Sequence, residues 1–363
     1  MSWNFLQKLL PPKNFLGVDI GTSSIKIVEI SQSANKSKLK NYGFISADIL
    51  SKNSFWTFKK NNILFSTEDV VKGIKAILQE ADIKTRRAIF SVPDFSTFFT
   101  NFELPPIKKE ELASTVQYKA RQYIPLPLKE VTLNWQVIKG KFLDQKGYDP
   151  NKQEKLKILL VAVSNEVINQ YKEIAILSEL ELISLEAEVF SLIRALVNEN
   201  EKDPIALIEI GSKSTTCSIV EQGKMENSYS IDISSDEFNK IIVEKFNIDY
   251  LEAEKLKKEY GLLKKENGIS HLLFPLVDII LVEVQKAFNN FYQKEKKEIK
   301  KIILAGGAVL LPGLREYFEN RLKKEIIISQ PFSKLDYPLV LEQTLKEIGP
   351  SYSIAIGAAL RGK

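Results

Sequence analysis

The sequence predicts an α/β protein that contains two related domains, with a small α+β subdomain inserted in the first. A repeat is the main evidence: residues 16–26 and 206–216 each read as an apolar strand, an acid, a glycine, hydroxyl residues and a second strand. A strand, a glycine turn and a helix follow at residues 301–322. Residues 95–182 have their own pattern of strands and helices, which marks them as the insertion.

The turn of each repeat is suited to binding phosphate. Gly21 and Gly211 allow a turn that a side chain would forbid, and they leave main-chain N–H groups facing outward. Asp19 and Glu209 precede these glycines by two residues. Two such hairpins facing each other across a cleft could hold the phosphates of a nucleotide, while the acids order the water shell of a metal ion.

The first domain begins with three predicted strands, at residues 15–20, 25–30 and 39–47. A helix over residues 67–78 starts with hydroxyl and acidic side chains, which stabilise a helix N-terminus. A short apolar strand at residues 87–92 ends before a proline. After the insertion, a strand at 182–185 and a helix at 187–197 return to this domain.

The insertion is predicted to contain three strands and two helices. The strands cover residues 97–104, 131–139 and 156–163, and the helices cover 108–123 and 165–178. The first helix is amphipathic and is stopped by the segment Ile124-Pro125-Leu126-Pro127.

The second domain follows with helices at residues 236–246, 251–260 and about 275–294, the strand at 301–305 and the helix at 314–322. A helix of small apolar residues at 351–360 ends the chain. The expected boundaries are therefore 1–94, 183–204 and 345–363 for the first domain, 95–182 for the insertion and 205–344 for the second domain.

Composition excludes several kinds of site. The formal charge of +5 comes from lysines spread along the chain, which is typical of a solvated surface and disfavours nucleic-acid binding. With one cysteine and one histidine, the chain can form no internal disulfide and no His/Cys zinc site, and we expect a cytoplasmic protein. No apolar run approaches the roughly 20 residues of a transmembrane helix. The segment from Trp3 to Leu10 could contact a membrane or a partner, or pack on its own domain.

The order hairpin, helix, hairpin, glycine turn and C-terminal helix resembles the actin-like ATPases, whose fold is a duplicated ribonuclease-H-like unit. Within this superfamily the chain resembles the PilM family of type IV pilus assembly proteins, which is related to FtsA. The resemblance covers nearly the whole length and includes Ser91-Val92-Pro93 and the C-terminal Ala355-Ile356-Gly357-Ala358. The segment Tyr123-Ile124-Pro125-Leu126-Pro127-Leu128 is its most specific part, because it lies in the insertion.

The resemblance implies that ATP and Mg²⁺ bind between the domains. Asp19 would order the waters of the magnesium ion, and Glu209 would do so from the other side. The phosphates would lie between the two hairpins, Glu254 and Lys257 would reach the ribose or base, and the glycine turn would pass beside the adenosine. The residues implied for the nucleotide are Asp19, Gly21, Thr22, Ser23, Lys26, Gly211, Ser212, Thr215, Glu254, Lys257, Gly306, Gly307 and Ala308. On spacing alone, Glu254 and Lys257 would be an exposed ion pair.

Three positions depart from the pattern of the family. Glu209 stands where an aspartate is usual, and Ser234-Ser235 stand where a glycine pair is common. Glu186 also replaces an aspartate, near the position from which relatives orient the attacking water. Glu186 and Glu209 are thus the candidate catalytic residues, and because hydrolysis needs a positioned water, we expect ATP turnover to be slow or absent.

The resemblance implies a cytoplasmic scaffold of the inner-membrane pilus complex rather than a metabolic enzyme. It would bind the cytoplasmic N-terminal peptide of PilN, in a groove between the insertion and the first domain, and would meet other complex and motor proteins there. It would reach the membrane only through these partners. Two alternatives use the same fold: an FtsA-like cytoskeletal protein and a sugar or acetate kinase.

Overall fold

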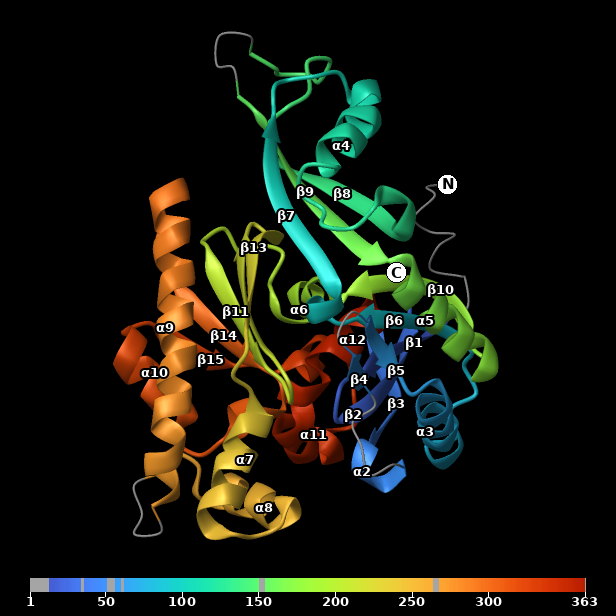
Figure 1. Cartoon of the computed structure of the whole chain (residues 1–363). Helices are drawn as coiled ribbons and strands as arrows, with labels where there is room; N and C mark the ends of the chain where they lie inside the picture. Colours follow the sequence, from blue (N-terminus) through green and yellow to red (C-terminus); the bar gives the residue numbers. More distant parts are fainter. Residues whose placement is uncertain are drawn as a thin grey trace.

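The structure is a computed structural model, and it describes residues 13–33, 36–50, 56–59, 62–149, 154–263 and 268–362. The segment from Trp3 to Leu10 lies outside these residues. Two five-stranded sheets, each covered by helices, form the body of the molecule, and a smaller three-stranded sheet stands above them (Figure 1).

The first sheet has the strand order β10-β6-β1-β2-β3. Strands β1, β2 and β3 are antiparallel neighbours, whereas β6 runs parallel to both β1 and β10. The first three strands are confirmed within a few residues of the predicted bounds, and β6 is confirmed at its predicted bounds. The bounds are β1 Lys13–Ile20, β2 Ser24–Gln32, β3 Ser37–Ser46, β6 Arg87–Val92 and β10 Glu181–Ala187.

The second sheet repeats this arrangement in the order β13-β12-β11-β14-β15. Its antiparallel strands are β11, β12 and β13, and β14 and β15 are added in parallel. The two sheets therefore have the same order and direction of strands, which confirms the predicted duplication. The bounds are β11 Ile205–Ile210, β12 Thr215–Glu221, β13 Lys224–Ile231, β14 Lys301–Ala305 and β15 Glu325–Ile328.

Helices cover both faces of the first sheet. One face packs against α3 and α5, and the other packs against α12 and the segment that precedes it. The bounds are α3 Thr67–Glu80, α5 Asn165–Leu177, α6 Glu188–Leu196, α11 Glu342–Ile348 and α12 Ser353–Leu360, with a short α2 at Ala47–Leu50 and a hairpin of β4 Trp56–Lys59 and β5 Asn62–Phe65.

The second domain contains α7 Ser235–Phe246, α8 Tyr250–Tyr260, α9 Ile269–Glu295 and α10 Leu314–Leu322. Helix α9 packs its buried side chains against the second sheet. It begins at Ile269, six residues before the predicted start, because Pro275 is accommodated inside the helix rather than opening it. Pro275 lies near the N-terminal end and is exposed, so its missing N–H group does not interrupt the long part of the helix.

The insertion has a sheet with the order β7-β9-β8 and one helix, α4, on one face. Its elements are β7 Thr97–Leu104, α4 Leu112–Ala120, β8 Val131–Lys139 and β9 Leu156–Ser164. The helix is shorter than predicted because residues Lys109–Glu111 form a 3₁₀ turn, and because the chain turns back after Ala120, whose carbonyl accepts from both Tyr123 and Ile124.

Packing moves two of the expected domain boundaries. The sequence assigns helix α5 to the insertion, but Val167, Tyr171 and Ile174 pack in the core of the first domain. The return to the first domain comes before residue 345, because Phe332 and Leu335 already pack against β2 and β3. Periodicity finds such elements but does not tell on which sheet their apolar side chains pack.

Candidate functional site

The two repeated hairpins have the same local geometry. In β1–β2, Asp19 pairs with Lys26 and the N–H of Gly21 donates to the carbonyl of Ser24 at 3.0 Å. In β11–β12, Glu209 pairs with Thr216 and the N–H of Gly211 donates to Ser214 at 3.0 Å. The predicted match between residues 16–26 and 206–216 is thus a match of structure, with an acid at the same place in each turn.

Four carboxyl groups lie close enough to influence one another: Asp19 and Glu209 from the hairpins, Asp94 after β6, and Glu188 at the start of α6. Burial raises the pKa of Asp94 to about 7 and that of Glu209 to about 8. Burial and the neighbouring acids raise the pKa of Glu188 well above its usual range. This acid cluster joins residues of both domains, so the two hairpins face each other across a shared space.

Lys26 is the cation nearest to Asp19. Its ammonium lies 4.0 Å from the Asp19 carboxylate and donates to the hydroxyl of Ser24 at 2.8 Å. Burial raises the pKa of Asp19, and Lys26 and a hydrogen bond from Ser91 oppose that rise. One lysine beside four acids leaves the acid cluster suited to a further positive charge.

Asp94 and Glu188 are bound to each other through the main chain. The N–H of Asp94 donates to Glu188 at 3.3 Å, and the N–H of Val189 donates to Asp94 at 3.3 Å. The other carboxylate oxygen of Asp94 is buried without a hydrogen-bond partner among the described residues. The sequence analysis missed both acids. Their signals were a polar residue directly after the apolar strand 87–92, and a second glutamate two positions beyond Glu186.

Glu186, an expected catalytic residue, lies outside the acid cluster and is paired with other side chains. Its side chain is 1% exposed and accepts hydrogen bonds from Ser191, Arg194 and Arg361. Burial alone would raise the pKa of Glu186, but these partners hold it below its usual value. Glu186 therefore forms ion pairs that join α6 to the end of α12. Glu188, two positions further along, is the glutamate that lies in the acid cluster.

The glycine turn after β14 lies against the second hairpin. Gly306 has a φ of 95°, and a Cβ on it would come within 2.5 Å of the Ile210 carbonyl oxygen and 2.6 Å of the Glu209 carboxylate. Only glycine fits there. Beside it, Gly307 faces open space, and Ala308 is buried with 7% exposure.

The N-terminus of α7 is attached to the second hairpin. Ser235 and Asp236 donate their N–H groups to Gly211 and Ser212 at 3.1 and 3.0 Å. Ser234 is the N-cap of α7, and its hydroxyl donates to Ser212 at 2.7 Å. The hydroxyls that replace the usual glycine pair thus stabilise the helix start and its contact with the hairpin.

One of the expected binding side chains, that of Thr215, has a structural partner. Thr215 is fully buried, and its hydroxyl donates to the carbonyl of Ile233 at 2.7 Å. Ser212, in contrast, lies in the turn itself and is only half-buried.

Glu254 and Lys257 form an ion pair at 2.5 Å, but the pair is not exposed: 4% of the Lys257 side chain is accessible. Lys257 also donates to Ser235 at 2.7 Å, and Asn239 donates to Glu254 at 2.6 Å. Burial lowers the pKa of Lys257. This pair therefore connects α8 to the beginning of α7, next to the second hairpin.

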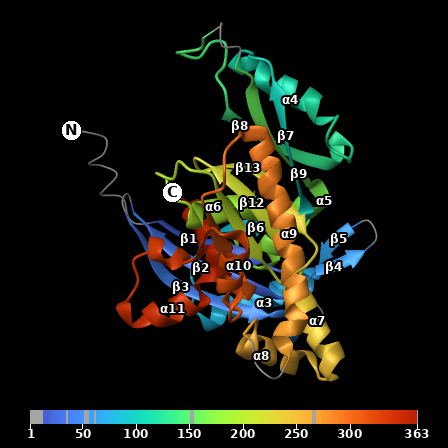
Figure 2. The ribbon, with the colours of Figure 1, turned by 90° about the vertical axis from the view of Figure 1, so that its left-hand side faces the viewer.

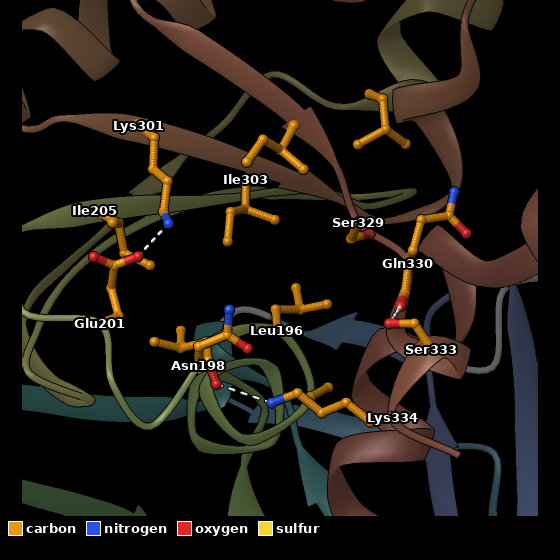
Figure 3. Close-up of a pocket in the computed structure, with 14 residues that line it drawn as sticks. Leu196, Asn198, Glu201, Ile205, Lys301, Ile303, Ser329, Gln330, Ser333 and Lys334 are labelled. Carbon is orange, nitrogen blue, oxygen red and sulfur yellow. Dashed lines mark hydrogen bonds and ion pairs between the residues drawn. The ribbon is translucent and has the colours of Figure 1, made fainter. Parts of the chain in front are cut away.

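A cavity of about 350 Å³ lies elsewhere, between the two segments that connect the domains (Figure 3). Asn198 and Glu201 come from the first crossing of the chain, and Gln330 and Lys334 come from the return. Its lysines already have partners: Lys301 pairs with Glu201, and Lys334 donates to the carbonyls of Arg194 and Val197 at 2.8 and 2.9 Å. The cavity therefore offers no charge that would select a ligand, and it is distinct from the acid cluster.

Within the part of the chain that the structure describes, no three His, Cys, Asp or Glu side chains are arranged to hold a metal ion by themselves. Over the same residues, no helix has the length and apolar character needed to cross a membrane.

The comparisons with known proteins agree on fold and family. The family model described as "Type IV pilus assembly protein PilM" matches residues 17–363. A solved structure described as a PilM-PilN type IV pilus biogenesis complex has a TM-score of 0.80 and 22% identity, over 96% of this chain and 98% of that chain. EutJ of Carboxydothermus hydrogenoformans matches with a TM-score of 0.57 and 15% identity, over 97% and 90% of the two chains. MreB5 of Spiroplasma citri bound to AMPPNP matches with a TM-score of 0.51 and 13% identity, over 96% and 95%.

These matches confirm the predicted actin-like fold. The family model spans nearly the whole sequence, including the insertion. The chain belongs to the PilM family of type IV pilus assembly proteins.

Proposed function

We propose that this protein is a cytoplasmic, ATP-binding scaffold of the type IV pilus assembly complex. The observation that carries the proposal is the acid cluster between two hairpins of the same geometry, one from each domain. The relative MreB5, with an AMPPNP-bound structure at 13% identity, supports a nucleotide at this place.

The residues present fit a magnesium–nucleotide complex. The N–H groups of Ser23, Ser212 and Lys213 have no acceptor among the described residues and lie in the two turns, where phosphate oxygens would accept from them. Gly21 and Gly211 bring the main chain close to the phosphates, with Thr22 beside them and Lys26 nearby. Mg²⁺ bound to the phosphates would supply the positive charge that the acid cluster lacks, through waters ordered by Asp19 and Glu209.

The adenosine would lie beside Gly306, Gly307 and Ala308. Gly307 faces open space, so a ring could approach its main chain closely. Glu254 and Lys257 would reach the ribose or base from α8. Their mutual ion pair and their bonds to Asn239 and Ser235 would hold both side chains in place before the nucleotide arrives.

For hydrolysis, Glu188 replaces Glu186 as the candidate that orients a water. Burial and the neighbouring acids raise the pKa of Glu188 and so favour its protonated form, which makes it a poorer base until a positive charge enters the cluster. We therefore propose slow or absent turnover. Nucleotide binding, rather than nucleotide consumption, would be the function of this site.

The proposed partner is the cytoplasmic N-terminal peptide of PilN, with other proteins of the inner-membrane complex and its motors nearby. The structural relative at 22% identity is a PilM-PilN complex, which supports this choice. The insertion exposes Tyr118, Tyr123 and Leu126, at 66%, 39% and 46%, on α4 and the turn after it. These side chains are candidate contacts for an extended apolar peptide, which would bring the protein to the inner membrane.

Calorimetric titration of the full chain with ATP and Mg²⁺ tests the nucleotide part. We expect micromolar, magnesium-dependent binding, lost in Asp19→Ala and retained in Asp203→Ala, which removes an exposed acid outside the cluster. A wild-type protein that is folded but releases no heat, or an Asp19→Ala variant that binds normally, would refute it. Titration of a PilN N-terminal peptide against wild type and Tyr123→Ala tests the partner in the same way.

A further inference from the structure

The insertion is attached to both domains. Its side chains Phe99, Ile138 and Leu159 pack into one apolar cluster with Val189 of the first domain and Met225 of the second. The rings of Phe99 and Phe190 are 6.4 Å apart in an edge-to-face arrangement. Figures 1 and 2 show β13 and the end of α9 reaching up to the three-stranded sheet of the insertion. The insertion, which branches from the first domain, thus also packs against the second domain.

A polar clamp reinforces this contact from the side of the second domain. We define the clamp as Lys157 of the insertion with Glu226 of β13 and Glu295 of α9. The ammonium of Lys157 lies 2.7 Å from Glu295 and also pairs with Glu226, and all three side chains are at most 15% exposed. Lys139 adds a second pair to Glu295 at 3.3 Å.

Main-chain contacts accompany the clamp. The amide of Asn101 donates to the carbonyl of Glu226, and Lys224 donates to the carbonyl of Ile138 at 3.1 Å. These bonds run in both directions between the insertion and β13. A rotation of the second domain against the first would break them, or would carry the insertion with it, because a desolvated charge pair cannot be separated without exposing or orphaning its members.

The other end of the insertion reaches the acid cluster. Asp94 is the residue at which the chain leaves β6 for β7, and it is joined through the main chain to Glu188. The insertion is therefore held at its root by a member of the acid cluster and at its far side by the clamp. A conformational change at the acid cluster and one at the surface of the insertion would therefore both move the insertion.

We propose that the insertion links the two binding regions, so that closure of the domains on a nucleotide and docking of a partner on the insertion change each other's affinity through the clamp. The link rests on the proposed function for the identity of the two ligands. The effect is reciprocal by thermodynamic necessity: the factor by which nucleotide changes peptide affinity equals the factor by which peptide changes nucleotide affinity.

The first experiment needs no ligand. Hydrogen–deuterium exchange is measured on the full chain for wild type, Lys157→Met and Lys155→Met. Lys155 is the matched control, because it forms an exposed ion pair with Glu103 inside the insertion, at 2.9 Å. We expect Lys157→Met to speed exchange about tenfold in the hairpin turns at 20–24 and 210–215 as well as in the insertion, and Lys155→Met to leave those turns unchanged. An effect confined to the insertion, or equal in both variants, overturns the proposal.

The second experiment separates this inference from the proposed function. The affinity for AMPPNP with Mg²⁺ is measured with and without a saturating PilN N-terminal peptide. We expect a change of at least about threefold in wild type and Lys155→Met, and a ratio near one in Lys157→Met. A ratio near one in wild type overturns the link even if both ligands bind. Absence of nucleotide binding refutes the proposed function instead, and the exchange experiment still decides the link. If Lys157→Met does not fold, Glu295→Gln removes the clamp charge from the other side.

Discussion

Replacing Glu186 and Glu188 separately by glutamine should change stability in opposite directions, although only Ala187 separates the two residues. Glu186 is a buried acceptor for Arg194 and Arg361, whose side chains are 30% and 43% exposed. Glutamine keeps the shape but removes the charge, which leaves both guanidinium groups without their carboxylate. Breaking a buried pair costs about 3–5 kcal/mol, and the partial exposure of the arginines reduces this to about 2 kcal/mol for Glu186→Gln.

Glu188 lies among other carboxyl groups, so replacing it by glutamine should stabilise the protein rather than destabilise it. The pKa of Glu188 is raised in the folded protein, so above the ordinary glutamate pKa the folded state holds a proton that the unfolded chain has lost, and the free energy of unfolding falls as the pH rises towards the folded pKa. Glutamine resembles the protonated acid and can still accept from the N–H of Asp94. We expect Glu188→Gln to be more stable than wild type at pH 6, and by at least as much at pH 9.

Thermal unfolding followed by circular dichroism at pH 6 and pH 9 measures both effects. For Glu186→Gln the loss of about 2 kcal/mol corresponds to a fall in Tm of about 4 °C at either pH. Glu188→Gln should raise Tm at both pH values, by at least as much at pH 9 as at pH 6. Equal losses in both variants, or no loss in Glu186→Gln, would show that the division between a structural ion pair and an acid cluster is wrong.

Three further outcomes follow from the same geometry. Burial raises the pKa of Glu209 to about 8, so the free energy of unfolding should fall as the pH rises from 5 to about 8, by up to about 1.4 kcal/mol per pH unit. Urea titrations should show a smaller fall for Glu209→Gln, and an equal fall would contradict the burial of this carboxyl. Gly306→Ala should lose about 2–3 kcal/mol of stability, because its Cβ would collide with the Ile210 carbonyl at a φ of 95°, whereas Gly307→Ala, which faces open space, should be nearly neutral in the same titration. Ala195→Val should fill part of the cavity between the domain connections and raise Tm by about 1–3 °C, and a lower Tm would mean that the cavity wall cannot accept the methyl groups.

The sequence predicted most of the strands because their signals are local. β6, β7, β8 and β14 have the predicted bounds, since each is an apolar or alternating run that ends at a proline, a glycine or a charged residue. β15 and β13 were not predicted. β15 has four residues at the edge of a sheet, and β13 is polar along much of its length, so neither has a pattern that stands out from a loop.

The candidate site divides in the same way. The chain order of the two hairpins and the glycine turn, with Asp19, Glu209 and Gly306, could be read from the sequence because each element repeats or matches a short pattern. The sequence could not show whether Glu186 or Glu188 lies in the acid cluster. The two glutamates lie at the junction of β10 and α6, where the direction of a side chain depends on where the strand ends and the helix begins.

The sequence by itself determined that this chain is a duplicated α/β protein with an insertion, since strand periodicity and glycine turns are local properties that survive in any context. Only the tertiary structure decided which acids share a space, to which core α5 belongs, and that Lys157 of the insertion meets Glu226 and Glu295 of the second domain. All three features depend on contacts between residues far apart in the sequence; in the clamp the paired residues are 69 and 138 positions apart. Such contacts are set by the packing of whole domains rather than by the neighbouring residues in the chain.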